Sequence, residues 1–141
     1  MRQKLSIVTL GVSDLNRSRA FYQDGLGWKP SSCSQESSIF FDLGGVGLAL
    51  FSFDELAKDA NVSPVRSGFT GITLAHNVNS AEEVDAVMQK EKQSGARIIK
   101  KAQQVFWGGY SGYFADPDGY LWEVAWNPFI ETDAKGALIF P

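Results

Sequence analysis

The chain carries one helical pattern twice, with the second copy 66 residues after the first. Asp14 and Ser80 are both good helix N-cap residues, and the stripes that follow them have the same spacing. The stripes consist of Leu15, Ser18, Phe21 and Tyr22 in the first copy and of Ala81, Val84, Val87 and Met88 in the second. This duplication predicts two similar modules.

Strand-forming runs surround each helical pattern in the same order. The first half has such runs at residues 5–12, 28–34, 37–43 and 46–53. The second half has them at residues 69–75, 96–104, 110–115 and 120–126. Each half therefore reads β-α-β-β-β, and we expect an α+β fold of two βαβββ modules. We expect the modules to pack about a pseudo-twofold axis, so that their curved mixed sheets form a cup.

The length of 141 residues suits one domain, and a hydrophobic fraction of 44% is enough to build a core. The domain, residues 1–141, is expected to consist of module one at 1–54, a linker at 55–67, module two at 68–127 and a C-terminal tail at 128–141. Pro64 marks the linker as mostly loop, after a helical turn near 54–60.

Charge and hydropathy exclude several partners. A net charge of −3 and a pI near 5.1 provide no basic field for counterion release, so we expect no nucleic-acid partner. No apolar run approaches the ~18 residues that a membrane span needs, and the first residues do not resemble a signal peptide. We therefore expect a cytoplasmic protein with no membrane partner. Cys33 is the one cysteine, which excludes an internal disulfide and a thiolate metal cluster.

The clearest hairpin signal lies within residues 113–126. Pro117 and Gly119 favour a turn there, because proline restricts φ and glycine tolerates positive φ. A single carboxylate, Glu123, interrupts the apolar run after this turn, and strand alternation places it on the face opposite Trp122. An acid that points into an apolar enclosure is a candidate for proton transfer or for ligand contact.

Two motifs resemble those of the vicinal oxygen chelate superfamily, which includes glyoxalase I, bleomycin-resistance proteins and extradiol dioxygenases. The first is Val-Ser-Asp-Leu-Asn-Arg-Ser-Arg-Ala-Phe-Tyr at 12–22, followed by Gly-Leu-Gly-Trp at 25–28. The second is Gly-Tyr-Phe-Ala-Asp-Pro-Asp-Gly-Tyr-Leu-Trp-Glu at 112–123. The resemblance runs from about Leu5 to Asn127 and implies the duplicated fold, although one fold hosts many activities.

The resemblance also implies four ligand positions for a divalent metal in the cup. They correspond here to Ile7, Ala49, Gly71 and Glu123. Only the glutamate has a side-chain donor, whereas catalytic zinc usually keeps three protein ligands. We therefore expect no tightly bound metal, no other cofactor, and neither glyoxalase I nor dioxygenase activity. His76, the single histidine, is expected to point away from the cup.

The metal-free cup is expected to bind a small organic molecule on mostly apolar walls. The expected lining residues are Ile7, Thr9, Ala49, Phe51, Gly71, Thr73, Leu121 and Glu123. Trp107 and Tyr110 are expected near the mouth, where aromatic rings can stack on a planar ligand. For Trp107, simple packing at the end of a strand is an equally good interpretation.

Three functions fit these residues. The first, which we favour, is sequestration of a small apolar or aromatic molecule, as in the resistance proteins. The second is a metal-independent isomerase or lyase in which Glu123, the candidate catalytic residue, acts as general acid or base. The third is a structural or regulatory dimer whose cup is filled by its own side chains. The family implies a homodimer, and its cups form either within one chain or between two.

Overall fold

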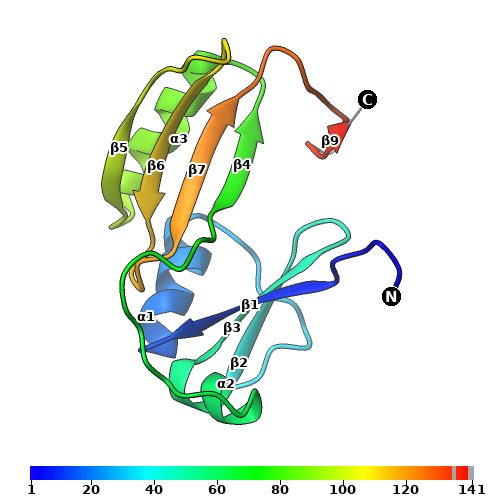
Figure 1. Cartoon of the computed structure of the whole chain (residues 1–141), viewed down its shortest axis with the longest axis vertical. Coiled ribbons are helices and arrows are strands. Elements are labelled where there is room, and N and C mark those ends of the chain that lie inside the picture. Colours follow the sequence, from blue (N-terminus) through cyan, green and yellow to red (C-terminus); the bar gives the residue numbers. More distant parts are fainter. Residues whose placement is uncertain (135, 140–141) are drawn as a thin grey trace. The chain divides into compact units, whose positions relative to one another are not determined.

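A computed structural model describes residues 1–134 and 136–139. The chain divides into two compact units, Met1–Thr70 and Gly71–Pro141. Figure 1 labels the helices and strands of both units. No helix in the described residues is long and apolar enough to cross a membrane. Residues 135, 140 and 141 of the expected tail lie outside the described ranges.

The first unit contains a three-stranded sheet with the strand order β1-β3-β2. Its elements are β1 (Ile7–Val12), α1 (Leu15–Ala20), the π-helical turn η1 (Phe21–Gly25), β2 (Ser38–Asp42), β3 (Gly47–Ser52) and α2 (Phe53–Asp59). Strand β3 pairs in parallel with β1 and antiparallel with β2. Asp14 begins α1 as expected, because its side chain accepts a hydrogen bond from the backbone N–H of Arg17 at 3.0 Å.

Helix α1 and the turn η1 cover one face of this sheet. Leu10, Leu48 and Leu50 are buried on that face, and the ring centroid of Tyr22 lies 5.9 Å from that of Phe41. Each large apolar side chain buried in this way stabilises the fold by roughly 1.5–3 kcal/mol. The apolar stripe read from the sequence is therefore the face by which the helix docks on its sheet.

The strand expected at 28–34 is wrong. An isolated bridge joins Pro30 to Phe41, and the segment forms no regular strand. Pro30 has no N–H to donate, and the hydroxyl of Ser34 accepts a hydrogen bond from the N–H of Phe40 at 2.9 Å. A side chain thus satisfies the edge of β2 where a fourth strand was expected.

The second unit contains a four-stranded sheet with the order β4-β7-β6-β5 and a two-stranded sheet of β8 and β9. Its elements are β4 (Leu74–Val78), α3 (Ala81–Gln93), β5 (Arg97–Gln104), β6 (Tyr110–Ala115), β7 (Leu121–Trp126), β8 (Glu131–Thr132) and β9 (Leu138–Ile139). Strand β7 pairs in parallel with β4 and antiparallel with β6, and β5 pairs antiparallel with β6. Figure 1 shows α3 along one face of the larger sheet.

The core of the second unit lies between α3 and this sheet. Val84 and Met88 on the helix are buried, as are Phe114, Trp122 and Val124 on the strands. Two of these rings stack nearly in parallel, with centroids 6.4 Å apart and an interplanar angle of 7°. The aromatic side of β7 therefore faces the helix, and its alternate residues face the other way.

The two units repeat one plan, which confirms the expected α+β fold with two similar modules. Asp14 and Ser80 both act as N-caps, and each first strand pairs in parallel with the last strand of its sheet. Strand β1 ends at Val12 and β4 ends at Val78, which keeps the offset of 66 residues. The pseudo-twofold axis and the cup stay predictions.

The strand expected at 69–75 begins later than expected, because β4 starts at Leu74. Gly71 has a φ of +79°, which is outside the extended region of a strand. Apolar and β-branched residues before Leu74 suggested an earlier start, but they lack a strand partner in the sheet. The 66-residue offset accounts for the observed position of β4.

Candidate functional site

A tight turn places Glu123 on β7. The buried carboxylate of Asp116 accepts hydrogen bonds from the N–H groups of Asp118 and Tyr120, at 3.0 and 2.8 Å. The N–H of Gly119 donates to the carbonyl of Asp116 at 3.0 Å, which closes the turn expected from the sequence. This short reversal determines which residues of β6 and β7 lie opposite each other.

Glu123 lies on the face of the second sheet that α3 does not cover. In the sheet register it is paired with Tyr113 on β6 and with Ala75 on β4. Tyr113 is in turn paired with Lys100 on β5. Paired residues point to the same side of a sheet, so these side chains share one surface with Leu121. We call this surface of Ala75, Lys100, Tyr113, Leu121 and Glu123 the Glu123 face.

The polar centre of the Glu123 face is a hydrogen bond between the side chains of Tyr113 and Glu123. Partial burial raises the pKa of Tyr113, and the hydrogen bond and the charge of Glu123 raise it further. The Nζ atom of Lys100 lies 5.8 Å from the centroid of the Tyr113 ring, within the range of a cation–π contact. At neutral pH the Tyr113 phenol therefore stays protonated and donates to Glu123.

This arrangement leaves Glu123 able to act on a bound molecule. A carboxylate has about four lone-pair sites, and the Tyr113 hydroxyl uses one of them. The others can accept a hydrogen bond from a hydroxyl or amine, or accept a proton. Leu121 and Ala75 beside it are apolar, so the face combines one anchoring acid with hydrophobic contact.

The side chains do not fit a divalent metal centre. Ile7, Ala49 and Gly71, which the resemblance places at three ligand positions, have no side-chain donor atom. Within residues 1–134 and 136–139, no group of three or more His, Cys, Asp or Glu side chains could hold a metal ion. A zinc site needs about three such ligands. No chemical step is therefore assigned to a metal at Glu123.

His76 lies on the opposite side of the sheet from Glu123. Its partner in the register is Val124, which faces α3, and its own side chain is exposed near that helix. Partial desolvation lowers the pKa of His76, and the carboxylate of Glu83 opposes part of this effect. The imidazole is therefore not directed to the same face as Glu123.

The first sheet places four of the expected lining residues on one face. Ile7 and Thr9 on β1 alternate with the residues that pack on α1, and Thr9 is paired with Ala49 on β3. Phe51 follows two residues later on the same side of β3. We call this surface of Ile7, Thr9, Ala49 and Phe51 the Thr9 face. Ile7 is 50% exposed, whereas Ala49 is 3% exposed.

Gly71 and Thr73 do not lie in a strand, contrary to expectation. Both precede β4 and are exposed. The offset of 66 residues makes Thr73, rather than Gly71, the equivalent of Ile7. The neutral hydroxyl of Thr73 is a weak metal ligand, so the conclusion about the donor set does not change.

The two expected aromatic residues occupy different positions. The ring of Trp107 covers Gly109, where a Cβ atom would overlap it. Tyr110 lies on the side of the sheet that faces α3, and its hydroxyl donates to the carboxylate of Asp85 at 3.1 Å. That hydrogen bond is the main cause that raises the pKa of Tyr110. Tyr110 therefore points away from the Glu123 face.

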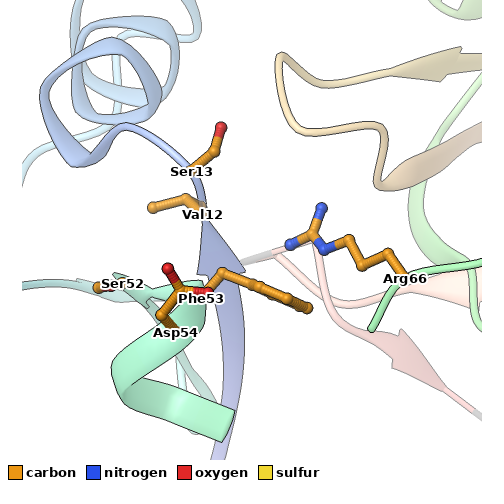
Figure 2. Close-up of a pocket in the computed structure, with 6 residues that line it drawn as sticks. All are labelled: Val12, Ser13, Ser52, Phe53, Asp54 and Arg66. Carbon is orange, nitrogen blue, oxygen red and sulfur yellow. The ribbon is translucent and has the colours of Figure 1, made fainter. Parts of the chain in front are cut away.

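A small cavity lies at the ends of β1 and β3 (Figure 2). It has a volume of about 220 Å³ and is lined by Val12, Ser13, Ser52, Phe53, Asp54 and Arg66. The Cζ atom of Arg66 lies 4.0 Å from the centroid of the Phe53 ring, and the guanidinium donates to the carbonyl of Gly11. These contacts hold the linker against β1. The cavity is smaller than the ~300 Å³ of typical ligand pockets, and we assign it no ligand.

Tyr113 and Lys100 are members of the Glu123 face that the sequence reasoning missed. A signal for Tyr113 was present, because the turn at 116–119 aligns it with Glu123 once the hairpin register is counted through. No comparable signal exists for Lys100. Irregularities in the pairing of β5 on both sides of Lys100 bring it opposite Tyr113.

Comparison with known proteins gives a consistent picture. The profile of the Glyoxalase/Bleomycin resistance protein/Dioxygenase superfamily matches residues 4–124. The metallothiol transferase FosB of Shouchella clausii (strain KSM-K16) is 30% identical over 118 residues, which cover 83% of this chain and 75% of that protein. The glutathione transferase FosA of Serratia marcescens is 31% identical over 126 residues, covering 88% and 81%.

Solved structures give the same result. A glyoxalase-related enzyme from Fulvimarina pelagi superposes with a TM-score of 0.89 at 36% identity, with 98% of each chain covered. Lactoylglutathione lyase from Agrobacterium tumefaciens superposes with a TM-score of 0.67 at 26% identity, covering 89% of this chain and 94% of that one.

Proposed function

Because the chain belongs to the Glyoxalase/Bleomycin resistance protein/Dioxygenase superfamily, we propose that it binds a small organic molecule at the Glu123 face without a divalent metal. The observation that carries this proposal is the hydrogen-bonded pair of Tyr113 and Glu123 among apolar neighbours. The molecule has an apolar or aromatic body and a hydroxyl or amine that donates to Glu123. Sequestration of such a molecule requires no bond to be broken.

The similarity to FosB and FosA is not extended to their named activities. Those relatives are named as a metallothiol transferase and a glutathione transferase. In this chain, Ile7 and Ala49 stand at positions where the family resemblance implies metal ligands. Binding without metal-assisted transfer is therefore the function that the donor set supports.

A ligand screen tests the binding proposal. Thermal unfolding is measured with aromatic and drug-like compounds, since a ligand at ~100 times its Kd adds ~2.7 kcal/mol to stability. We expect at least one stabiliser, and we expect Glu123→Gln and Tyr113→Phe to weaken its binding. Glu131→Gln, a change at an exposed carboxylate on β8, is the matched control and leaves binding unchanged.

Two results would contradict the proposal. One is a set of stabilisers that bind Glu123→Gln and Tyr113→Phe as tightly as the parent protein. The other is a near-stoichiometric amount of nickel, zinc or iron in protein purified without chelator, lost in Glu123→Gln. The second result refutes the metal-free part even if a ligand is found.

A second candidate function is a metal-independent isomerase or lyase. The specific observation in its favour is the Tyr113 hydroxyl beside Glu123, because a phenol can stabilise negative charge while the carboxylate moves a proton. The similarity to a glyoxalase-related enzyme at 36% identity also supports it. Any turnover found with carbonyl compounds should fall at least 100-fold in Glu123→Ala. Turnover that persists in this variant removes Glu123 from the reaction.

The homodimer and the cytoplasmic location remain part of the proposal. Light scattering of the purified full chain tests the first. A filled cup, the third function considered from the sequence, predicts instead that the ligand screen finds no stabiliser.

A further inference from the structure

A groove of the second unit lies away from the Glu123 face, between α3 and the edge strand β5 (Figure 1). Its volume is about 420 Å³, within the range of roughly 300–1,000 Å³ that is usual for sites of small molecules. None of its lining residues belongs to the Glu123 face. It is therefore a separate site, and it goes beyond the function proposed above.

The local structure explains why a groove forms here. Asp85, Met88 and Lys92 are spaced by three and four residues and so form one stripe along α3. On β5, Ile98 is paired with Phe114 and therefore faces the helix. The register shifts after Ile98 bring the consecutive residues 101 and 102 to the groove, which a regular strand would direct to opposite sides.

The groove combines apolar and cationic lining. Met88, which is 6% exposed, contributes apolar lining together with Ile98 and Ala102. Lys92 and Lys101 are exposed and contribute two positive charges. The one acidic residue, Asp85, already accepts a hydrogen bond from the hydroxyl of Tyr110. The cations therefore determine the sign of the ligand charge that fits.

We propose that this groove binds a small amphiphile with one anionic group, such as a medium-chain carboxylate. The anionic group lies between Lys92 and Lys101, and the apolar chain covers Met88, Ile98 and Ala102. An added peptide strand fits less well, because strand addition uses a regular row of backbone donors and acceptors. The irregular pairing of β5 and its lysines disfavours such an edge-to-edge contact.

Octanoate is a suitable probe for this site on the full chain. We follow its binding by the shifts of backbone amide signals in ¹H–¹⁵N NMR spectra. The expected shifts saturate with octanoate and cluster in residues 85–92 and 97–102. The uncharged analogue 1-octanol should bind at least fivefold more weakly, because it lacks the charge that Lys92 and Lys101 attract.

Charge variants localise the site. The double variant Lys92→Gln/Lys101→Gln should raise the Kd for octanoate at least tenfold. The matched control Lys58→Gln/Lys90→Gln removes the same charge outside the groove and should change the Kd less than twofold. Glu123→Gln should also leave octanoate binding unchanged, since the two sites are separate. Circular dichroism spectra check that each variant is folded.

Three outcomes overturn the inference. Shifts confined to the Glu123 face, or binding lost in Glu123→Gln, assign octanoate to the other site. Equal binding of octanol and octanoate, or an unchanged Kd in Lys92→Gln/Lys101→Gln, removes the role of the two lysines. Lysine-dependent sedimentation with phosphatidylglycerol vesicles, without saturable octanoate binding, assigns the groove to a membrane surface instead of a free amphiphile.

Discussion

Equivalent positions of the two sheets carry an alanine in one unit and a glutamate in the other. Ala49 on β3 is paired with Thr9, and Glu123 on β7 is paired with Ala75. Thr9 and Ala75 are themselves equivalent by the 66-residue offset. Ala49 is 3% exposed, whereas Glu123 is half-buried. The repeated backbone plan thus determines the position, and the side chain decides whether it packs or can act chemically.

A second comparison concerns the helices. Glu91 on α3 is 6% exposed, and its Oε2 atom has no hydrogen-bond partner. The equivalent residue of the first unit is Gly25, at the end of η1. The second unit therefore holds a buried acid where the first has no side chain at all. Four predictions break or sharpen these comparisons.

The largest expected effect comes from transferring the carboxylate between the two sheets. Ala49→Glu should lower the free energy of unfolding by more than about 3 kcal/mol, because it buries a charge without a partner. Glu123→Ala should lower it by less than about 1 kcal/mol, because the residue is only half-buried and loses one hydrogen bond. Urea denaturation measures both, with Ala49→Ser as control. Equal losses in the two variants would show that the two positions are not distinguished by burial.

The buried acid of α3 should give the next largest effect. Burial raises the pKa of Glu91 above its ordinary value of 4.5, and the charge of Lys90 opposes this in part. Between the ordinary and the raised pKa, the folded protein binds more protons than the unfolded chain. Stability therefore falls as the pH rises through that window, and the penalty persists above it.

Removing this charge should reverse the penalty. Glu91→Gln should stabilise the protein by about 1 kcal/mol at pH 7 and by much less below pH 4. Chemical denaturation at the two pH values measures the difference. Glu36→Gln, at an exposed acid, should change stability equally little at both. A Glu91→Gln variant that is less stable at pH 7 would mean that the carboxylate has a partner in solution.

The two helix caps should have similar and smaller effects. Asp14 and Ser80 each accept a hydrogen bond from the N–H three residues later, at 3.0 and 3.2 Å. Replacing either by alanine should therefore lower the free energy of unfolding by about 1 kcal/mol. Replacement by glycine should have a smaller effect. Thermal unfolding of the four variants tests whether the duplicated caps are also energetically equivalent.

The smallest expected change is a titration. In Glu123→Gln the negative charge beside Tyr113 is lost, so the pKa of Tyr113 should fall toward its ordinary value of 10.0. Ultraviolet absorption of the phenolate measures this, and Tyr113→Phe identifies the signal among the four tyrosines. A pKa of Tyr113 that is unchanged in Glu123→Gln would show that burial alone raises it.

The elements that could be predicted depend on neighbours in the sequence. The capping of α1 and α3, the turn before Glu123 and the repeated plan follow from a few adjacent residues. The two wrong strands fail for a different reason. The segment at 28–34 contains Pro30, and Gly71 adopts a positive φ, so apolar residues nearby could not extend a strand.

The candidate site was predicted only in part for the same reason. Alternation along β7 places Glu123 opposite Trp122, and this required no partner strand. Its contact with Tyr113 depends on the hairpin register, and the position of Lys100 depends on the irregular pairing of β5. Such register shifts have no clear local signature.

The sequence by itself determined the duplicated α+β plan, the caps, the hairpin and the family, because periodicity, capping and turn chemistry act over a few residues. Only the tertiary structure decided which side chains meet. The Tyr113 and Glu123 pair, the buried acid Glu91 and the groove beside β5 all arise from pairing and packing between distant segments. Those contacts depend on register and burial, which single residues do not specify.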